Sequence, residues 1–180
     1  MESKLIYRNG NNGINVIDGN FVGYKNLVYN NIMDVAFKPE GSGRIICKSD
    51  DFVLLKLKSE VSEEFKEERE QEGRIDVRIK IEDTVYEKVV DELAGSENLE
   101  KSKSLDGLFL TFKDCLTYEI DLEKLLFIVV VDDYNYIFNY NYINTIIERK
   151  NLNRVIEKSK ENYDIKNSKK TSKTKRFRND

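Results

Sequence analysis

Carboxylate side chains are the groups in this chain whose types and spacing could support chemistry. Two adjacent pairs, Asp50-Asp51 and Asp132-Asp133, stand at the ends of apolar segments, and Glu119 and Glu123 lie close to the second pair in the sequence. Carboxylates brought together in this way bind divalent cations, so a carboxylate- and metal-dependent enzyme is one hypothesis. Adjacent acids in hairpin turns are more often solvated turn residues, and we favour that interpretation.

Other catalytic chemistry has little support in the sequence. The absence of histidine excludes Ser-His-Asp and Cys-His sets and histidine metal ligands. The glycine-rich stretches 10–13 and 41–43 do not lead from a strand into a helix with Lys-Ser or Lys-Thr, so they indicate turns. Cys47 and Cys115 are too few for a disulfide framework or a zinc site, and we expect buried thiols. We therefore predict a non-enzymatic protein with no cofactor.

An aromatic ladder spans residues 134–142. If these residues form one strand, five rings point to one side, namely Tyr134, Tyr136, Phe138, Tyr140 and Tyr142. Such a row of rings could stack nucleic-acid bases or hold a peptide. We favour a core or a dimer interface, with the tyrosine hydroxyls at its rim, because no cations interleave with the rings. Tyr134, Tyr136, Tyr140 and Tyr142 are the candidate binding residues of this segment.

A basic tail ends the chain. From Lys166 onward there are seven cations and one anion, a net charge of +6, although the whole chain carries −3. The cations are Lys166, Lys169, Lys170, Lys173, Lys175, Arg176 and Arg178, and all but Lys166 are candidate binding residues. The tail could attract nucleic acid, an acidic partner or an anionic membrane by charge, or it could only increase solubility.

Composition places the chain among globular proteins of ordinary size. It has 180 residues, of which 39% are hydrophobic and 35% charged. The N-terminus lacks the apolar region of a signal peptide, and the run Leu125–Val131 is too short to span a membrane. We expect a cytoplasmic protein, in the interior of a bacterial or host cell. The abundance of Asn, Lys, Ile and Tyr is typical of AT-rich genomes, which include those of many phages and viruses.

Short apolar segments separated by turn residues predict an antiparallel meander in the first third of the chain. The expected strands are 5–7, 14–17, 21–24, 27–29, 32–37, 44–48 and 52–58. Ser59 or Ser62 is a suitable N-cap for a helix near 60–71, which Gly73 would end.

The middle of the chain has clearer periodicity. Residues 74–82 alternate apolar and polar side chains, which predicts a half-buried strand, and the apolar stripe over 84–94 predicts a helix. The charged stretch 96–104 is expected to be an exposed, mobile loop. From residue 105 we expect four strands, including Leu125–Val131, and then a helix over 143–163 with apolar patches at Ile143, Ile146 and Ile147.

Two segments follow a similar plan of hydrophobic spacing. Residues 28–35 and 117–122 each carry an aromatic residue followed by an Ile-x-x-Val or Ile-x-Leu step that leads toward a hairpin and a helix. This pattern resembles the bacterial PH-like and GRAM-like small barrel domains, over about residues 5–72 and more loosely 105–163. The resemblance implies a binding or scaffold module, with a tandem arrangement as one interpretation, and it transfers no functional residue.

The sequence therefore predicts an α+β fold of mainly antiparallel units, each followed by a helix, with an internal repeat as one interpretation. We expect an N-terminal unit over 1–73, a C-terminal unit over 74–164 and a disordered basic tail over 165–180. Buried positions should include Ile75, Ile79, Leu108, Leu110, Phe112, Leu126, Ile128, Val130, Ile146 and Ile147.

The expected function is that of a binding protein, phage- or virus-encoded, that acts on an unidentified host protein. The alternatives are nucleic-acid binding through the tail and the carboxylate enzyme. Strands with apolar residues on both faces need cover on both sides, so we expect a homodimer, unless helix 84–94 supplies that cover.

Overall fold

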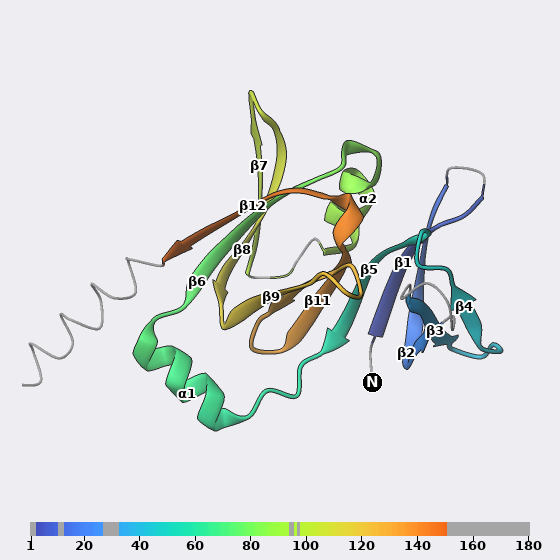
Figure 1. Ribbon diagram of the computed structural model, residues 1–180, viewed down its shortest axis with the longest axis horizontal. Helices are drawn as coiled ribbons and strands as arrows, with labels where there is room; N and C mark the ends of the chain where they lie inside the picture. The colour runs from blue at the N-terminus through green and yellow to red at the C-terminus, as the bar shows by residue number, and fades with distance from the viewer. Residues whose placement is uncertain (1–2, 11–12, 27–32, 94–95, 97, 151–180) are drawn as a thin grey trace, which may run out of the picture.

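The fold consists of two antiparallel sheets and two α-helices, as a computed structural model of the chain shows (Figure 1). The structure describes residues 3–10, 13–26, 33–93, 96 and 98–150. The elements are β1 (Ser3–Arg8), β2 (Ile14–Asn26), β3 (Met33–Pro39), β4 (Ile45–Cys47), β5 (Phe52–Lys58), α1 (Glu63–Glu72), β6 (Ile75–Ile81), α2 (Asp83–Leu93), β7 (Leu99–Ser104), β8 (Gly107–Cys115), β9 (Thr117–Asp121), β10 (Leu126–Val130), β11 (Tyr134–Asn139), the 3-10 helix η1 (Tyr140–Tyr142) and β12 (Ile143–Lys150).

Both sheets mix strands that are distant in the sequence. The larger sheet has the order β4-β3-β2-β1-β5-β11-β10-β9, and the smaller has the order β12-β6-β8-β7. All of these pairs are antiparallel, which confirms the predicted α+β class with mainly antiparallel strands. Figure 1 shows β7 and β8 projecting as a hairpin at one end of the molecule, with α2 beside its base and α1 at the opposite end.

The clearest sequence patterns are confirmed. The alternating segment forms β6, whose Val77, Ile79 and Ile81 are buried, and the apolar stripe forms α2. Helix α1 begins after Ser62, whose Oγ accepts a hydrogen bond from the Phe65 N–H at 3.3 Å, and Gly73 follows its last residue with a φ of 95°. Helix α1 therefore begins and ends where its capping residues favour.

Two hydrophobic cores occupy the two faces of the larger sheet. The first lies between the two sheets and α2, and Phe127 and Phe138 are among its fully buried rings. The second lies on the other face, where β3 and β4 pack over β5, β10 and β11, and it contains Phe37, Leu55 and Ile137. Strands β5, β10 and β11 are thus covered on both faces within one chain. The cover that motivated the homodimer prediction is intramolecular for these strands, and the homodimer itself stays a prediction.

Glycine at position 19 permits the fold of the second core. A Cβ atom there would lie 2.3 Å from the Lys38 carbonyl oxygen and 2.8 Å from the Phe37 ring. No side chain fits in this space, so β2 and β3 approach each other at Gly19 as only glycine allows.

The helix predicted over 143–163 is wrong for its first eight residues, which form β12, and residues 151–163 lie outside the described residues. The apolar spacing of Ile143 and Ile146 is helix-like, but β12 has a register shift between Ile143 and Thr145 where it pairs with β6. The extra residue changes the alternation of the strand, so that Ile143 and Ile146 both pack on the first core.

Two predicted loops are also wrong. The stretch 96–104 contains β7, which pairs with β8 over its whole length, although it has only one apolar residue. The expected strands 14–17 and 21–24 are one strand, β2, because the residues between them, 18–20, lie inside it and pair with β1 and β3. In both cases pairing with a neighbouring strand overrides local preference. The expected strand 27–29 lies outside the described residues.

The predicted buried positions divide into two groups. Ile79, Leu110, Phe112 and Leu126 are buried. The other six are only half-buried, namely Ile75, Leu108, Ile128, Val130, Ile146 and Ile147.

The predicted boundary at residue 73 does not separate the larger sheet, since β5 from the first unit pairs with β11 from the second. The two segments of the suggested repeat also pair differently. In the first segment β5 follows β4 along the chain but does not pair with it, and pairs with β1 instead. In the second segment β11 does pair with β10, the strand before it, and also with β5. The division into units and the repeat stay predictions.

Candidate functional site

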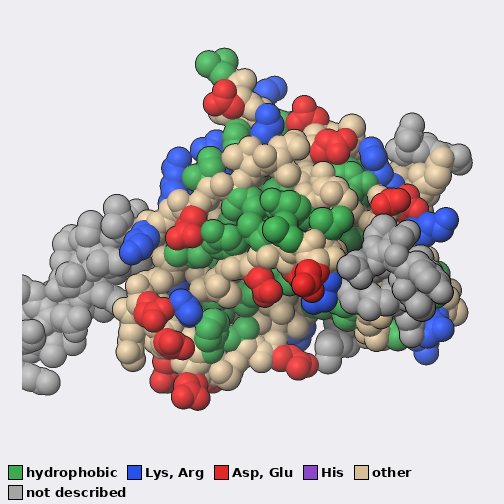
Figure 2. All heavy atoms as spheres, viewed as in Figure 1, with side chains coloured by type: hydrophobic (Ala, Val, Ile, Leu, Met, Phe, Trp, Pro, Cys, Tyr) green, Lys and Arg blue, Asp and Glu red, His purple; other side chains and the backbone are tan. Residues whose placement is uncertain are grey.

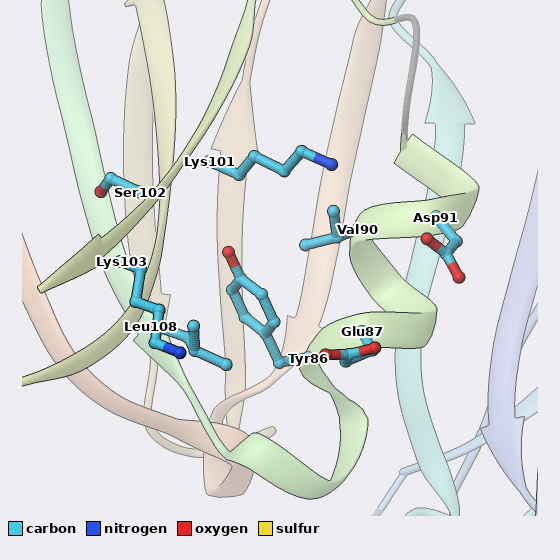
Figure 3. A pocket seen from close by; sticks show the side chains of 8 residues that line it. All are labelled: Tyr86, Glu87, Val90, Asp91, Lys101, Ser102, Lys103 and Leu108. Carbon is cyan, nitrogen blue, oxygen red and sulfur yellow. The ribbon is translucent and has the colours of Figure 1, made fainter.

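A groove between α2 and the β7–β8 hairpin is the candidate site, and we call it the α2–β7 groove. It encloses about 340 Å³. Its apolar lining is Tyr86 and Val90 from α2 and Leu108 from β8, as Figure 3 shows. The polar lining is Glu87 and Asp91 from α2 and Lys101, Ser102 and Lys103 from β7.

The helix wall of the groove follows from the sequence of α2. Val85, Val89 and Leu93 are spaced along one stripe and are buried in the first core. Tyr86 and Val90 each directly follow a residue of this stripe in the sequence, which places them one step around the helix. They therefore lie at the edge of the buried stripe and face the groove. Both are only 6% exposed, while Glu87 and Asp91 beyond them are exposed.

Tyr86 ties the helix to the hairpin. Its hydroxyl donates a hydrogen bond to the Phe109 carbonyl oxygen at 3.2 Å. Burial, and secondarily the negative charge of Glu87, raises the pKa of the Tyr86 hydroxyl, so this group stays a neutral donor at physiological pH. The ring therefore has a fixed place on the floor of the groove.

The strand wall is set by the hairpin register. Lys101 lies opposite Leu110 and Lys103 opposite Leu108, so the two lysines share a sheet face with residues that pack on the first core or line the groove. In Figure 3 the Lys101 side chain extends toward Val90. The Lys103 side chain runs beside Leu108 in the same view, so both cationic side chains lie along the groove and that of Lys101 reaches toward the helix.

The ammonium groups of this wall are not paired with any carboxylate of the described residues. Within the part of the chain that the structure describes, neither Lys101 nor Lys103 forms an ion pair, and neither do Glu87 and Asp91. Other charges on the same elements are paired. Lys113 of β8 contacts Glu100 at 3.1 Å and Asp76 at 3.4 Å.

Strand β7 is at the edge of the smaller sheet, and within the described residues it pairs only with β8. Ser104 and Gly107 close the two-residue turn of the hairpin. The closing pair of such a turn exchanges hydrogen bonds, and bonded and non-bonded pairs then alternate. Lys103 is one pair and Lys101 three pairs from the closing pair, so their backbone N–H and C=O groups point away from β8. Strand β7 thus offers unpaired backbone groups at the sheet edge, beside a groove with two cations and an apolar floor.

The structure does not bring the predicted aromatic residues together as an open ladder. Strand β11 ends at Asn139, whose side chain accepts a hydrogen bond from the Asn141 N–H at 3.1 Å, and residues 140–142 form η1. Tyr136 and Tyr142 are 3% and 6% exposed, and the Tyr142 hydroxyl donates to the Asp50 carbonyl oxygen at 3.1 Å.

The remaining two candidate tyrosines, Tyr134 and Tyr140, are half-buried against the first core. Tyr134 is also covered by the Lys56 ammonium group, 4.0 Å from the ring centroid. The candidate cations Lys169, Lys170, Lys173, Lys175, Arg176 and Arg178 lie outside the described residues.

The carboxylate pairs are placed in separate environments. Asp50 and Asp51 lie in the turn between β4 and β5. Asp132 receives two hydrogen bonds from Arg74, at 2.6 and 2.9 Å, which engage both of its carboxylate oxygens. Among the described residues no group of three or more Cys, Asp and Glu side chains is arranged to hold a metal ion. None of the described helices is long and apolar enough to cross a membrane.

A second surface feature is apolar. Figure 2 shows hydrophobic side chains gathered in the centre of one face, with acidic and basic side chains around them. At the β9 edge of the larger sheet, Ile120 is 39% and Leu122 66% exposed. Tyr118 of β9 donates a hydrogen bond from its hydroxyl to Glu148 of β12 at 3.1 Å, which links the edges of the two sheets.

Sequence reasoning missed the α2–β7 groove because it treated 96–104 as a loop. Asp106-Gly107 is a strong hairpin-turn signal, and it stands at the turn between β7 and β8, where Asp106 is a turn residue and Gly107 begins the apolar strand β8. The signal was therefore present, but the strand before it has too few apolar residues to be recognised by alternation.

Comparisons with known proteins leave the chain without an assigned family. No family model, curated protein or solved structure matches it.

Proposed function

We propose that this chain is a non-enzymatic interaction protein that binds an extended segment of a partner protein in the α2–β7 groove. The single observation that carries the proposal is the position of β7, a sheet-edge strand beside a helix and a cavity of about 340 Å³. An extended peptide that adds to such an edge gains main-chain hydrogen bonds from the strand and side-chain contacts from the groove.

The backbone groups supply part of the affinity. Lys101 and Lys103 offer two N–H and two C=O groups. At about 1 kcal/mol each, four hydrogen bonds contribute about half of the roughly 8 kcal/mol that a micromolar complex requires. The association entropy opposes binding as well, so the side chains in the groove must supply the remainder. Specificity then depends on the lining residues.

Three finer features belong to the same proposal. The resemblance to PH-like and GRAM-like small barrels supports a binding module, because domains of that kind mostly serve as binding and scaffold units. A phage or viral origin, with a host protein as partner in the cytoplasm, is consistent with the amino-acid composition, which is typical of AT-rich genomes. A homodimer stays part of the proposal, because β4, β9 and β12 are sheet edges with one neighbouring strand each among the described residues.

Selection from a display library of random ten-residue peptides tests the proposal without a known partner. The selected peptides should bind the full chain and lose binding to the Lys101→Pro variant, because proline lacks the N–H that strand addition uses. Lys101→Ala retains the N–H and should retain most of the binding. Ile46→Pro places the same change on the edge strand β4, where Ile46 is 52% exposed, and should have no effect.

Thermal unfolding of each variant establishes that it is folded before binding is compared. Peptides that bind Lys101→Pro as well as the unchanged chain would contradict the proposal. So would peptides whose binding is lost with Ile46→Pro, since these would use a different sheet edge.

A further inference from the structure

We propose that the segment bound in the α2–β7 groove carries acidic side chains at alternate positions, which pair with Lys101 and Lys103. This inference rests on the proposed function, because it names the chemistry of the segment that adds to β7.

The spacing of the lysines matches that of an extended chain. Lys101 and Lys103 are two residues apart on one strand, so their side chains point to the same face about 7 Å apart. A strand that adds to β7 repeats the same spacing, and its residues i and i+2 come to lie opposite the two lysines. Carboxylates at those two positions therefore meet both cations at once.

The lysines of the groove differ from neighbouring lysines in having no ion-pair partner among the described residues. Lys80 donates a hydrogen bond to the Asp106 carbonyl oxygen at 2.5 Å, and Lys113 is paired with two carboxylates. Within the described chain Lys101 and Lys103 have no such contact. Lysines on an edge strand also oppose pairing with another copy of that strand. They favour a segment of opposite charge.

The groove floor favours glutamate over aspartate. Tyr86, Val90 and Leu108 provide apolar surface below the two ammonium groups. A glutamate reaches a cation on this wall with its methylene groups lying against that surface, as long charged side chains commonly do. Aspartate lacks one methylene group and covers less of the floor.

The helix wall restricts where the acids can be placed. Glu87 and Asp91 lie on α2, and in Figure 3 the Asp91 carboxylate lies beyond Val90 and the Glu87 carboxylate beside Tyr86, both on the helix side of the groove. They repel an acidic side chain that turns toward the helix, so acids are favoured only on the strand side. Neutralising the two carboxylates should therefore tighten binding of an acidic segment. The basic tail of the chain has the wrong charge to occupy the strand side.

Three labelled model peptides test the inference by fluorescence anisotropy with the full chain at 150 mM NaCl. They are Thr-Glu-Val-Glu-Val-Glu-Thr, Thr-Gln-Val-Gln-Val-Gln-Thr and Thr-Lys-Val-Lys-Val-Lys-Thr. The glutamate peptide should bind about fivefold more tightly than the glutamine peptide, as expected for two exposed ion pairs. The lysine peptide should bind most weakly.

Charge-reversal variants separate the groove from the overall charge. Lys101→Glu combined with Lys103→Glu should reverse the order of the glutamate and lysine peptides. Lys38→Glu combined with Lys48→Glu changes the net charge equally at exposed positions outside the groove and should leave the order unchanged. Glu87→Gln combined with Asp91→Asn should tighten binding of the glutamate peptide. The basic tail is present in every variant, so its contribution cancels in these comparisons.

The outcomes distinguish the inference from the function on which it rests. Equal binding of all three peptides, sensitive to Lys101→Pro, would overturn the acidic preference and leave strand addition in place. No binding of any peptide up to millimolar concentration would overturn both. Competition of the glutamate peptide by a generic oligonucleotide, lost when Lys101 and Lys103 are reversed, would assign the cations to nucleic acid and overturn the inference.

Discussion

Replacement of Arg74 by methionine should destabilise the fold strongly, although Arg74 lies outside the groove. Its side chain is 6% exposed and makes a two-pronged contact with Asp132 at 2.6 and 2.9 Å. It also lies 2.7 Å from a Glu70 oxygen and donates to the Asp114 carbonyl oxygen at 3.3 Å. Burial alone would lower the pKa of Arg74, but the hydrogen bond and charge of Asp132, followed by the other carboxylates, raise it.

Removal of the guanidinium leaves these carboxylates without their cation. Breaking a buried ion pair by removing one partner costs about 3–5 kcal/mol. The acids can regain water, since Asp132 is 36% and Glu70 28% exposed, so we expect a value near the lower limit, about 3 kcal/mol. For a chain of this length that corresponds to a fall of about 6–12 °C in Tm.

Urea unfolding followed by circular dichroism measures this loss. Arg69→Met is the matched control, because Arg69 pairs with Glu72 at 2.7 Å on the exposed side of α1 and should lose less than about 1 kcal/mol. Combining Arg74→Met with Asp132→Asn should give a coupling energy of at least about 1 kcal/mol. The reasoning is refuted if Arg74→Met costs no more than Arg69→Met, or if the coupling energy is near zero.

Three further outcomes are expected. The free energy of unfolding of Gly19→Ala should fall by at least about 2 kcal/mol, because the new Cβ atom would overlap a β3 carbonyl. Gly43→Ala is the control, since it has open space around it and should change stability by less than about 1 kcal/mol. Equal urea midpoints for the two variants would contradict this. Burial raises the pKa of the Cys47 and Cys115 thiols from 9.0 to about 12. A thiol reagent at pH 8 should therefore label these thiols only after unfolding. Labelling of the native chain would show that they are accessible. Because the folded pKa is above the unfolded one, this contribution to stability is complete below pH 9 and is lost as the pH rises toward 12, which urea titrations at pH 8 and pH 10 should detect.

The parts of the fold that were predictable from sequence are those with an uninterrupted period. Strand β6 alternates over seven residues, and α2 places its apolar residues at helical spacing, so each element was recognisable without its neighbours. Strand β12 was not recognisable in this way, because its register shift next to Ile143 gives the apolar residues of a strand the spacing that is typical of a helix. A bulge of that kind depends on the partner strand β6 and has no local sequence signal.

The candidate site was less predictable than the fold. Its helix wall follows from the stripe of α2, but its strand wall is β7, which becomes a strand only by pairing with β8. The order of strands in the larger sheet depends on contacts such as β5 with β11, which join residues about eighty positions apart. Local propensity contains no information about such contacts, so the groove emerges only from the assembled structure.

The most direct test of strand addition in the α2–β7 groove is amide hydrogen exchange at single residues, measured by NMR with and without a saturating selected peptide. The Lys101 and Lys103 amides point away from β8 and should exchange markedly more slowly in the complex, because each would donate to the added strand. The Ile46 amide, on the edge strand β4, should be unaffected. Unchanged exchange at Lys101 and Lys103 in a saturated complex would contradict the account.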